Sequence, residues 1–409
     1  MSTRSILPKT SPQRTSRLVN RIAPSGIRRF FDLLASMEGV ISLGVGEPDY
    51  VTPWHIRETA ITALEKGYTM YTSNAGMPEL RQALSQYLKD KYGLSYDPDS
   101  ELLITVGVSE GMDLAARALL DPGDEVIIPD PCYVAYPANV MLAGGVPVMV
   151  PTTCENNFEL LYQDIETRIT RKTRAIFFGS PANPTGAVIT RERLLEIAEL
   201  ARKHNLIVIS DEIYGKLVYG VAHTCVPTLP GMKERTILLS GFSKAYAMTG
   251  WRIGYAAGPK EIIAAMTKIH QYTIMCAPIM GQMAAIEALK SGDVAAAEMV
   301  EDYNRRRLVM VKGLTEIGLN CFEPKGAFYA FPSVTSTGLT SEEFSELLLY
   351  EEKVACVPGT AFGKCGEGYV RCCYATSMAN IEEALGRIKN FVSRHAGKPV
   401  KPDTPPVRK

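Results

Sequence analysis

The chain has 409 residues, of which 46% are hydrophobic and 22% charged, and it is long enough for two domains or one large α/β unit. Lys plus Arg and Asp plus Glu both number 44, so the formal charge of +0 argues against a general nucleic-acid or acidic-membrane surface. No apolar run approaches the ~20 residues of a membrane-spanning helix, so we predict none.

The cysteines and histidines exclude two further classes. Nine cysteines are scattered along the chain without a CxxC pair, which argues against a disulfide framework and favours a reducing, cytoplasmic location. The five histidines never fall at metal-ligand spacing, so no metal site is predicted.

The two ends are predicted to be irregular. The first 31 residues contain seven Lys or Arg and no acid, which fits either a transit-like peptide or a flexible arm over 1–20. We favour the arm, because no clear cleavage signal follows it and an amphipathic helix is predicted in "PSGIRRFFDLL" (24–34). The Pro-rich basic end, 397–409, is predicted to be disordered.

The middle of the chain alternates buried strands with helices. Continuous apolar runs predict strands at 101–107, 124–130, 146–152, 174–180, 206–214, 236–241 and 252–258, and helices at 109–120, 136–145 and 191–205. This order predicts the α/β class, with a mostly parallel sheet covered by helices on both faces.

After about residue 260 the pattern becomes helical, with short strands at 326–332 and 368–375, and predicts a smaller α+β domain. We therefore divide the chain into a large domain at 51–290 and a small domain at 291–396. The N-terminal segment 21–50 is predicted to join the small domain.

Polar and aromatic residues follow the predicted strands at their carboxyl ends, where open α/β sheets bind ligands. They are Val108 and Ser109 after Gly107, then Tyr133, Asn183, Asp211, Ser243, Lys244 and Arg252. One anion-binding turn, one aromatic ring, one amide, one carboxylate and one lysine are thus expected at one edge of the sheet.

The turn "VGVSEG" opens a helix, and the free N–H groups there favour an anion such as phosphate. Arg252 and Ser243 would add donors to the same anion. Each also has a structural interpretation: any strand–helix turn looks similar, Arg252 would suit a salt bridge, and Ser243 would suit a helix N-cap.

Asp211 in "VISDEIY" is a carboxylate leaving a buried strand, which needs a cation or a strong donor. A protonated pyridine nitrogen is one such partner, and a turn cap is the alternative. Asn183 would donate to a ring hydroxyl or form an Asx-turn, and Tyr133 would stack on a planar ring or pack in the core.

Lys244 suits covalent chemistry. Nearby cations lower the pKa of a lysine, so that its amine attacks an aldehyde and afterwards moves protons. An aldehyde on a phosphorylated pyridine ring describes pyridoxal 5′-phosphate (PLP).

The motifs "SPANPTG", "SDEIY" and "GFSKAYAMTGWRIGY" resemble those of the class I/II, fold-type I PLP-dependent aminotransferases. The likeness runs from "ISLGVGEPDY" (41–50) through "TMYTSNAGMPELR" (69–81) to "YVRCCYA" (369–375), and is greatest to the prokaryotic aspartate/aromatic subgroup. It implies transfer of an α-amino group to a 2-oxo acid such as 2-oxoglutarate.

The resemblance also implies roles for individual residues. Lys244 would be the Schiff-base lysine, Asp211 would hold the ring nitrogen, and Asn183 with Tyr214 the ring hydroxyl. Tyr133 would stack on the ring, and Val108, Ser109, Ser243 and Arg252 would bind the phosphate. Arg371 would grip the substrate carboxylate beside Gly46. Tyr71 would reach the phosphate of a second subunit, so a homodimer is implied.

Two departures leave choices open. Gly241 stands where the family often has serine, so the phosphate hydroxyl would come from Ser243 or Ser240. For a second substrate carboxylate the sequence offers Gln271 and Tyr272, or a mobile arginine such as Arg28 or Arg29, while Tyr71, Tyr133, Tyr272 and Phe328 would make an aromatic-tolerant pocket.

Other functions on the same fold remain alternatives at this point. A PLP β-lyase or an aminocyclopropane-carboxylate synthase-like enzyme would use the same cofactor residues. A regulatory protein is disfavoured, because 31 N-terminal residues are too few for a helix-turn-helix module.

Overall fold

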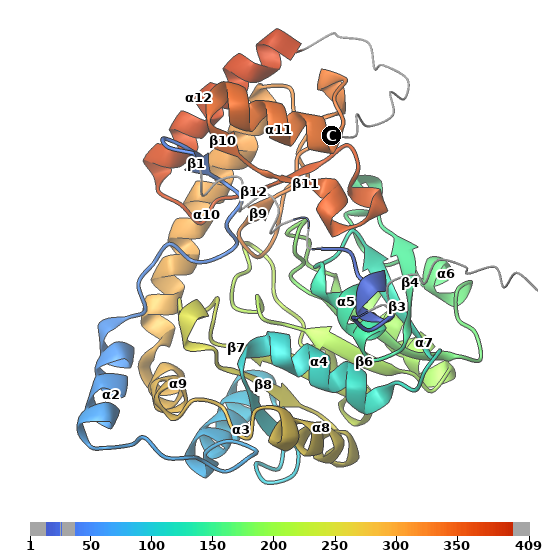
Figure 1. The fold of residues 1–409 in the computed structure, drawn as a ribbon, viewed down its shortest axis with the longest axis vertical. Coiled ribbons are helices and arrows are strands. Elements are labelled where there is room, and N and C mark those ends of the chain that lie inside the picture. The colour runs from blue at the N-terminus through green and yellow to red at the C-terminus, as the bar shows by residue number, and fades with distance from the viewer. Residues whose placement is uncertain (1–13, 25, 27–36, 396–409) are drawn as a thin grey trace, which may run out of the picture.

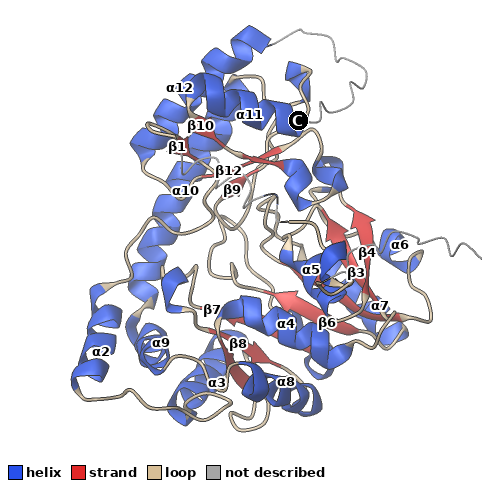
Figure 2. Ribbon diagram, in the orientation of Figure 1, coloured by secondary structure: helices blue, strands red, loops and turns tan. Residues whose placement is uncertain are grey.

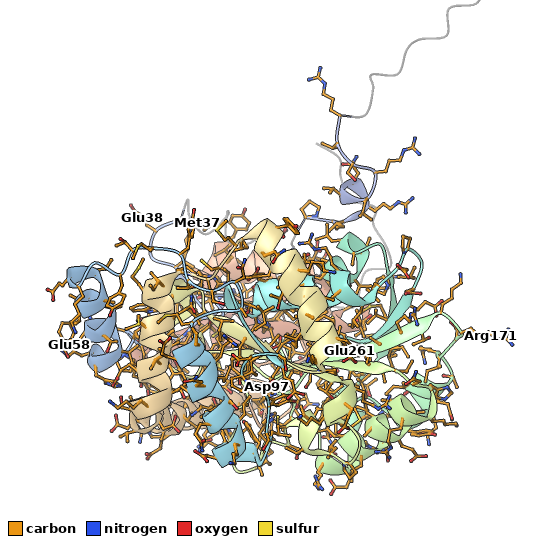
Figure 3. The ribbon with its side chains drawn as sticks, turned by 90° about the horizontal axis from the view of Figure 1, so that it is seen from below. Met37, Glu38, Glu58, Asp97, Arg171 and Glu261 are labelled. Carbon is orange, nitrogen blue, oxygen red and sulfur yellow. The ribbon has the colours of Figure 1, made fainter. Side chains whose placement is uncertain are left out.

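The computed structural model describes residues 14–24, 26 and 37–395 (Figure 1). The predicted tail at 397–409, most of the basic arm and most of the helix predicted at 24–34 lie outside the described residues. Figure 3 shows charged side chains at the periphery, with Glu58 and Arg171 pointing outward at opposite edges.

A seven-stranded sheet forms the centre of the larger body. Its strands are β2 (Leu102–Thr105), β3 (Glu125–Asp130), β4 (Val146–Pro151), β5 (Thr173–Gly179), β6 (Ile207–Asp211), β7 (Thr236–Gly241) and β8 (Gly254–Ala257). They lie in the order β2-β8-β7-β6-β5-β3-β4. All pairs from β7 to β4 are parallel, and β8 is antiparallel to both neighbours. The mostly parallel sheet and the positions of its strands are confirmed.

Helices cover both faces of the sheet (Figure 2). Phe177 of β5 belongs to a buried cluster with side chains of α4 (Gly107–Leu119), α5 (Ala135–Leu142) and α8 (Lys260–Thr273). Its neighbours Ile176 and Phe178 belong to a cluster with α6 (Tyr162–Glu166) and α7 (Arg191–Lys203). Successive side chains of a strand point to opposite faces, so a continuous apolar run is buried on both sides.

The smaller body carries the C-terminal part of the chain. A three-stranded sheet of β9 (Tyr329–Ala330), β12 (Val370–Cys373) and β11 (Val357–Pro358) lies there with α11 (Ser341–Glu352) and α12 (Met378–His395). In Figure 1 the long helix α10 (Asp293–Glu316) runs between the two bodies. β1 (Ile41–Ser42) pairs in parallel with β10 (Val354–Ala355), so an N-terminal strand joins the C-terminal part. The domain boundaries themselves stay a prediction.

Three helices complete the larger body: α2 (Trp54–Glu65), α3 (Pro78–Tyr92) and α9 (Ile279–Ser291), of which α9 packs against the other two. Local signals set their ends. Pro78 begins α3, and Gly93 ends it in the left-handed conformation with φ of 70°. Among the described residues every helix is too short or too polar to cross a bilayer.

Candidate active site

The edge of the sheet at which six strands end, β4 among them because it is parallel to β3, carries the predicted polar residues. β7 and β2 are both antiparallel to β8, so β2 runs in the same direction as β7, β6, β5 and β3. Their carboxyl ends therefore meet at one edge, to which the start of β8 also belongs.

A cavity of about 790 Å³ opens at this edge, beside the smaller body. Its wall includes all but one of the residues to which the resemblance assigned a role, Tyr71 being the exception. They are Gly46, Val108, Ser109, Tyr133, Asn183, Asp211, Tyr214, Ser243, Lys244, Arg252 and Arg371. Residues from the N-terminal segment, such as Gly46, thus share one pocket with Arg371 of the C-terminal part of the chain, so no single sequence motif contains the whole site.

Lys244 lies in the turn after β7. Its Nζ donates a hydrogen bond to the carbonyl oxygen of Gly46 at 2.7 Å and lies 5.9 Å from the ring centre of Tyr214. Burial lowers the pKa of Lys244 to about 8, and the positive charges of Arg371 and Arg252 act in the same direction. Roughly a tenth of the amine is therefore neutral, and nucleophilic, at pH 7.

Asp211 ends β6 as a buried carboxylate with two donors. Tyr136 Oη donates to Oδ2 at 2.9 Å, and the backbone N–H of Ile213 donates to Oδ1 at 3.1 Å. Burial raises the pKa of Asp211 to about 6, while these two hydrogen bonds lower it. The group is therefore mostly ionised at pH 7. Among the described residues no cation forms an ion pair with it, so a protonated ring nitrogen would supply a missing partner.

The N-terminus of α4 forms an anion-binding end of the cavity. Gly107, with φ of +70°, turns the chain from β2 into the helix, and a Cβ at this position would lie 2.6 Å from Arg252 Nη2. The first-turn residues Val108 and Ser109 line the cavity beside Ser243. Their free N–H groups and the Arg252 guanidinium favour a phosphate. Ser240 instead donates to the carbonyl oxygen of Glu212 at 3.1 Å, which leaves Ser243 as the candidate hydroxyl.

Arg371 on β12 forms a second cationic end. It is 2% exposed, and it donates from Nη1 to Asn183 Oδ1 at 2.9 Å and from Nη2 to the carbonyl oxygen of Gly44 at 2.7 Å. Its Nε is buried without a hydrogen-bond partner, and no described carboxylate pairs with the guanidinium. A buried charge with an unused donor suits a carboxylate ligand.

The aromatic wall differs from the prediction. Phe328 is fully buried behind the cavity, while its neighbour Tyr329 lines it. Tyr329 Oη lies 2.7 Å from Tyr214 Oη, and burial raises the pKa of both tyrosines, so both stay protonated. Gly46 must lack a side chain here, because a Cβ would lie 2.5 Å from Tyr329 Oη.

Two more predicted wall residues lie elsewhere in the single chain. Tyr71 is 81% exposed and Tyr272 is 85% exposed, and neither lines the cavity. Arg28 and Arg29 lie outside the described residues. Of the four aromatic residues predicted to form the pocket, Tyr71, Tyr133, Tyr272 and Phe328, only Tyr133 lines the cavity of the single chain, so this prediction is wrong for one subunit. The other aromatic wall residues are Tyr136, Tyr214 and Tyr329.

Sequence reasoning missed Tyr136 and Tyr329. Tyr133 precedes α5 and Tyr136 lies in its first turn, so no helix or strand periodicity linked Tyr136 to the predicted site. Tyr329 is adjacent to Phe328, and alternation along a short strand predicts that only one of them faces the cavity. Which one faces it depends on the register of β9 with β12, where Tyr329 pairs with Cys373.

The assembled groups can act on a small anionic ligand. The cavity wall carries two guanidinium groups, those of Arg252 and Arg371, together with a lysine amine and a buried carboxylate. Within the described part of the chain, no group of three or more His, Cys, Asp or Glu side chains is placed to hold a metal ion.

Comparisons with known proteins identify the family. A model of the family "Aminotransferase class I and II" matches residues 38–388. The chain belongs to this family. The aminotransferase is 48% identical to an aspartate aminotransferase of Pyrococcus abyssi over 91% of this chain and 96% of that one. It is 47% identical to aromatic-amino-acid aminotransferase 2 of Thermococcus litoralis over 91% and 96% of the two chains.

Solved structures agree with the sequence comparison. The crystal structure of an aromatic aminotransferase from Pyrococcus horikoshii matches with a TM-score of 0.86 at 47% identity, over 90% of this chain and 99% of that one. An aspartate aminotransferase from Thermus thermophilus with maleate matches with a TM-score of 0.87 at 39% identity, over 92% and 99%. The predicted family, fold-type I architecture and transaminase activity are confirmed.

Proposed function

We propose that this aminotransferase uses PLP, held in the 790 Å³ cavity, to move the α-amino group of an amino acid to a 2-oxo acid. The observation that carries the proposal is the convergence of Lys244, Asp211 and Arg371 on one cavity from three separate parts of the chain. Lys244 has a lowered pKa, Asp211 is mostly ionised at pH 7, and Arg371 has an unused hydrogen-bond donor.

The residues present fit PLP. Ser109, Ser243 and Arg252 would hold the phosphate at the start of α4, and Tyr133 would cover the ring. Asp211 would hold the ring nitrogen with a charge that Tyr136 orients. Asn183 and Tyr214 would face the ring hydroxyl. When bound, PLP supplies an aldehyde that accepts amino groups and a ring that withdraws electrons.

The chain's own groups would then position substrate and move protons. Arg371 would hold the α-carboxylate through parallel hydrogen bonds, which fixes the Cα–H bond relative to Lys244. The neutral amine of Lys244 would accept the Cα proton and return it to another carbon. Its lowered pKa makes both transfers feasible near pH 8.

We propose that the amino donors include neutral and aromatic amino acids. The cationic side chains of the described cavity wall are Lys244, Arg252 and Arg371, and each already has a role above. A second substrate carboxylate would need another cation, and Arg28 and Arg29 remain candidates in the part of the sequence outside the described residues. The named relatives act on aspartate and on aromatic amino acids.

We further propose a homodimer with shared active sites. Tyr71 does not line the cavity of its own chain, and it is largely exposed, as are Met70 and Tyr272. Such exposed apolar side chains suit burial against a second copy. A cytoplasmic location also stays a prediction; the nine free cysteines suit a reducing compartment.

An amino-donor screen tests the proposal. The purified protein is expected to be yellow and to form keto acids from tyrosine, aspartate and alanine with 2-oxoglutarate or pyruvate as acceptor. Without acceptor, one equivalent of keto acid per active site should form and no ammonia should appear. Sustained release of ammonia would instead identify a β-lyase, and a colourless protein that gains no absorbance with added PLP would refute cofactor binding.

A further inference from the structure

A buried histidine–glutamate pair lies directly behind the anion-binding end of the cavity. His270 of α8 is fully buried, and its Nδ1 lies 2.6 Å from Glu110 Oε1. A carboxylate can only accept, so Nδ1 carries the hydrogen. The other ring nitrogen, Nε2, is buried without a hydrogen-bond partner. His270 is therefore oriented by Glu110 alone among the described side chains.

Glu110 in turn fixes the turn that opens α4. Its Oε2 accepts the backbone N–H of Val106 at 2.6 Å, and Thr105 Oγ1 donates to the carbonyl oxygen of Gly107 at 2.9 Å. These two bonds hold the residues directly before Val108 and Ser109, which line the cavity. Glu110 itself follows Ser109 in the first turn.

The position of Glu110 has an electrostatic consequence. A carboxylate in the first turn of a helix is favoured by the helix dipole, but it repels an anion bound at the same end. Its side chain is only 10% exposed, so solvent screens this repulsion weakly. The hydrogen bond from His270 to Oε1 draws part of this negative charge toward the imidazole, which does not line the cavity.

We propose that His270, acting through Glu110, is a positioning residue that sets the affinity of the α4 turn for the phosphate of PLP. The inference rests on the proposed PLP site and adds two residues that contact neither ring nor substrate. The pair holds the Val106–Gly107 turn in place and offsets a negative charge that the phosphate would otherwise meet.

The test compares two ligands that differ only in the phosphate. Equilibrium dialysis of the cofactor-free full chain measures the affinities for PLP and for pyridoxal, which lacks the phosphate. In His270→Phe, Glu110 loses its donor, and the ratio of PLP to pyridoxal affinity should fall about tenfold. His270→Gln keeps a donor and should retain most of the wild-type ratio. In His270→Phe with Glu110→Gln, the unpaired charge is gone and the ratio should recover in part.

A matched pair elsewhere separates this role from stability. His223 Nε2 lies 2.6 Å from Glu212 Oε2, and both side chains are buried, but neither lines this cavity. His223→Phe should lower the melting temperature and leave the affinity ratio unchanged. Equal loss of PLP and pyridoxal binding in His270→Phe, an unchanged ratio, or an equal ratio change in His223→Phe would overturn the proposal. Wild-type chain that binds neither compound would refute the PLP site itself.

Discussion

The Nζ of Lys244 and the carbonyl oxygen of Gly46 are 2.7 Å apart, joined by a hydrogen bond that crosses from the central sheet to the N-terminal segment. The same glycine leaves room for Tyr329, whose hydroxyl meets that of Tyr214. The amine, the two tyrosines and the segment after β1 are therefore held by one another. A substitution at Gly46 should therefore alter the position of the Lys244 amine, because the two are joined through the Gly46 carbonyl oxygen.

Gly46→Ala tests this coupling. Its Cβ would lie 2.5 Å from Tyr329 Oη, so the Tyr329–Tyr214 contact must open or the Gly46 carbonyl must move. Overpacking of this kind costs about 1–3 kcal/mol, and we expect kcat/KM to fall about tenfold. Combining the change with Tyr329→Phe removes the clashing hydroxyl and should restore part of the loss. An unchanged kcat/KM in Gly46→Ala would show that the segment after β1 can shift without disturbing Lys244, and would contradict the coupling.

The lowered pKa of Lys244 predicts how PLP uptake depends on pH. Only the neutral amine attacks an aldehyde, and burial favours this form by lowering the pKa to about 8. The uptake rate of the cofactor-free chain should therefore rise about tenfold per pH unit below pH 8 and level off above it. N-α-acetyl-lysine in the same assay should keep rising toward its pKa of about 10.4. A protein profile that also climbs to pH 10 would contradict the shift.

Asp211→Asn separates charge from shape. The substitution keeps the side-chain size but removes the charge that would hold a protonated ring nitrogen, so kcat/KM should fall about 10³-fold. Stability should not fall through this charge: the folded pKa is raised from 3.8 to about 6, so the ionised group destabilises the fold above pH 6. Activity and thermal melting at pH 7 measure the two effects. Near-normal turnover would show that Asp211 does not hold the ring nitrogen of PLP.

Tyr136→Phe offers a graded comparison. It removes the hydrogen bond that lowers the pKa of Asp211, and so we expect the acidic limb of the kcat/KM profile to move to higher pH, with a smaller loss at pH 8 than at pH 6. A loss that is equal at all pH values would assign Tyr136 to packing alone.

Subunit mixing tests whether the sites are shared. Tyr71→Phe and Lys244→Ala chains each carry one defect, and if Tyr71 serves the partner's site, a mixed dimer contains one intact site and one doubly defective site. Mixtures with demonstrated subunit exchange should therefore gain activity above either parent. Activity that never exceeds the Tyr71→Phe parent would mean that each site uses its own Tyr71.

The sequence was sufficient to predict that the site lies at the carboxyl ends of the strands, and which residues lie there. The carboxyl ends of parallel strands meet at one edge of the sheet whatever the conformation of the loops. Lys244 follows β7, Asp211 ends β6 and Arg252 precedes β8. These strands have strong apolar patterns, and the placement of the three residues follows from them. The sequence could not predict whether Phe328 or Tyr329 faces the cavity, because they are adjacent at the start of the two-residue strand β9, and its pairing with β12 decides which one lines the wall.

Sequence patterns also could not predict side-chain contacts between segments that are far apart in the chain. The donors around Asp211 and the pairing of His270 with Glu110, which are 160 positions apart, depend on how α5 and α8 pack on the sheet. Tyr71 and Tyr272 pose a different problem, since the second chain of the proposed homodimer would change their surroundings.

The carboxylate grip predicted for Arg371 has the sharpest test. Every α-amino acid carries the same carboxylate, so the group that holds it should matter for all donors. Two Arg371 donors bond to Asn183 and Gly44, and a lysine has neither this fork nor its fixed plane. Arg371→Lys should therefore lower kcat and raise KM together, by about 10²-fold or more in kcat/KM.

The donor series distinguishes the alternatives for Arg371. Arg371→Lys disturbs the hydrogen bonds to Asn183 and Gly44 but breaks no ion pair among the described residues, so the melting temperature should fall only modestly and the PLP absorbance should change little. Tyrosine, aspartate and alanine should lose kcat/KM by similar factors, because the lost contact is the one they share. A loss confined to aspartate would make Arg371 a side-chain selector. Early melting with normal turnover in the folded fraction would make it a structural residue, and the assignment would be wrong.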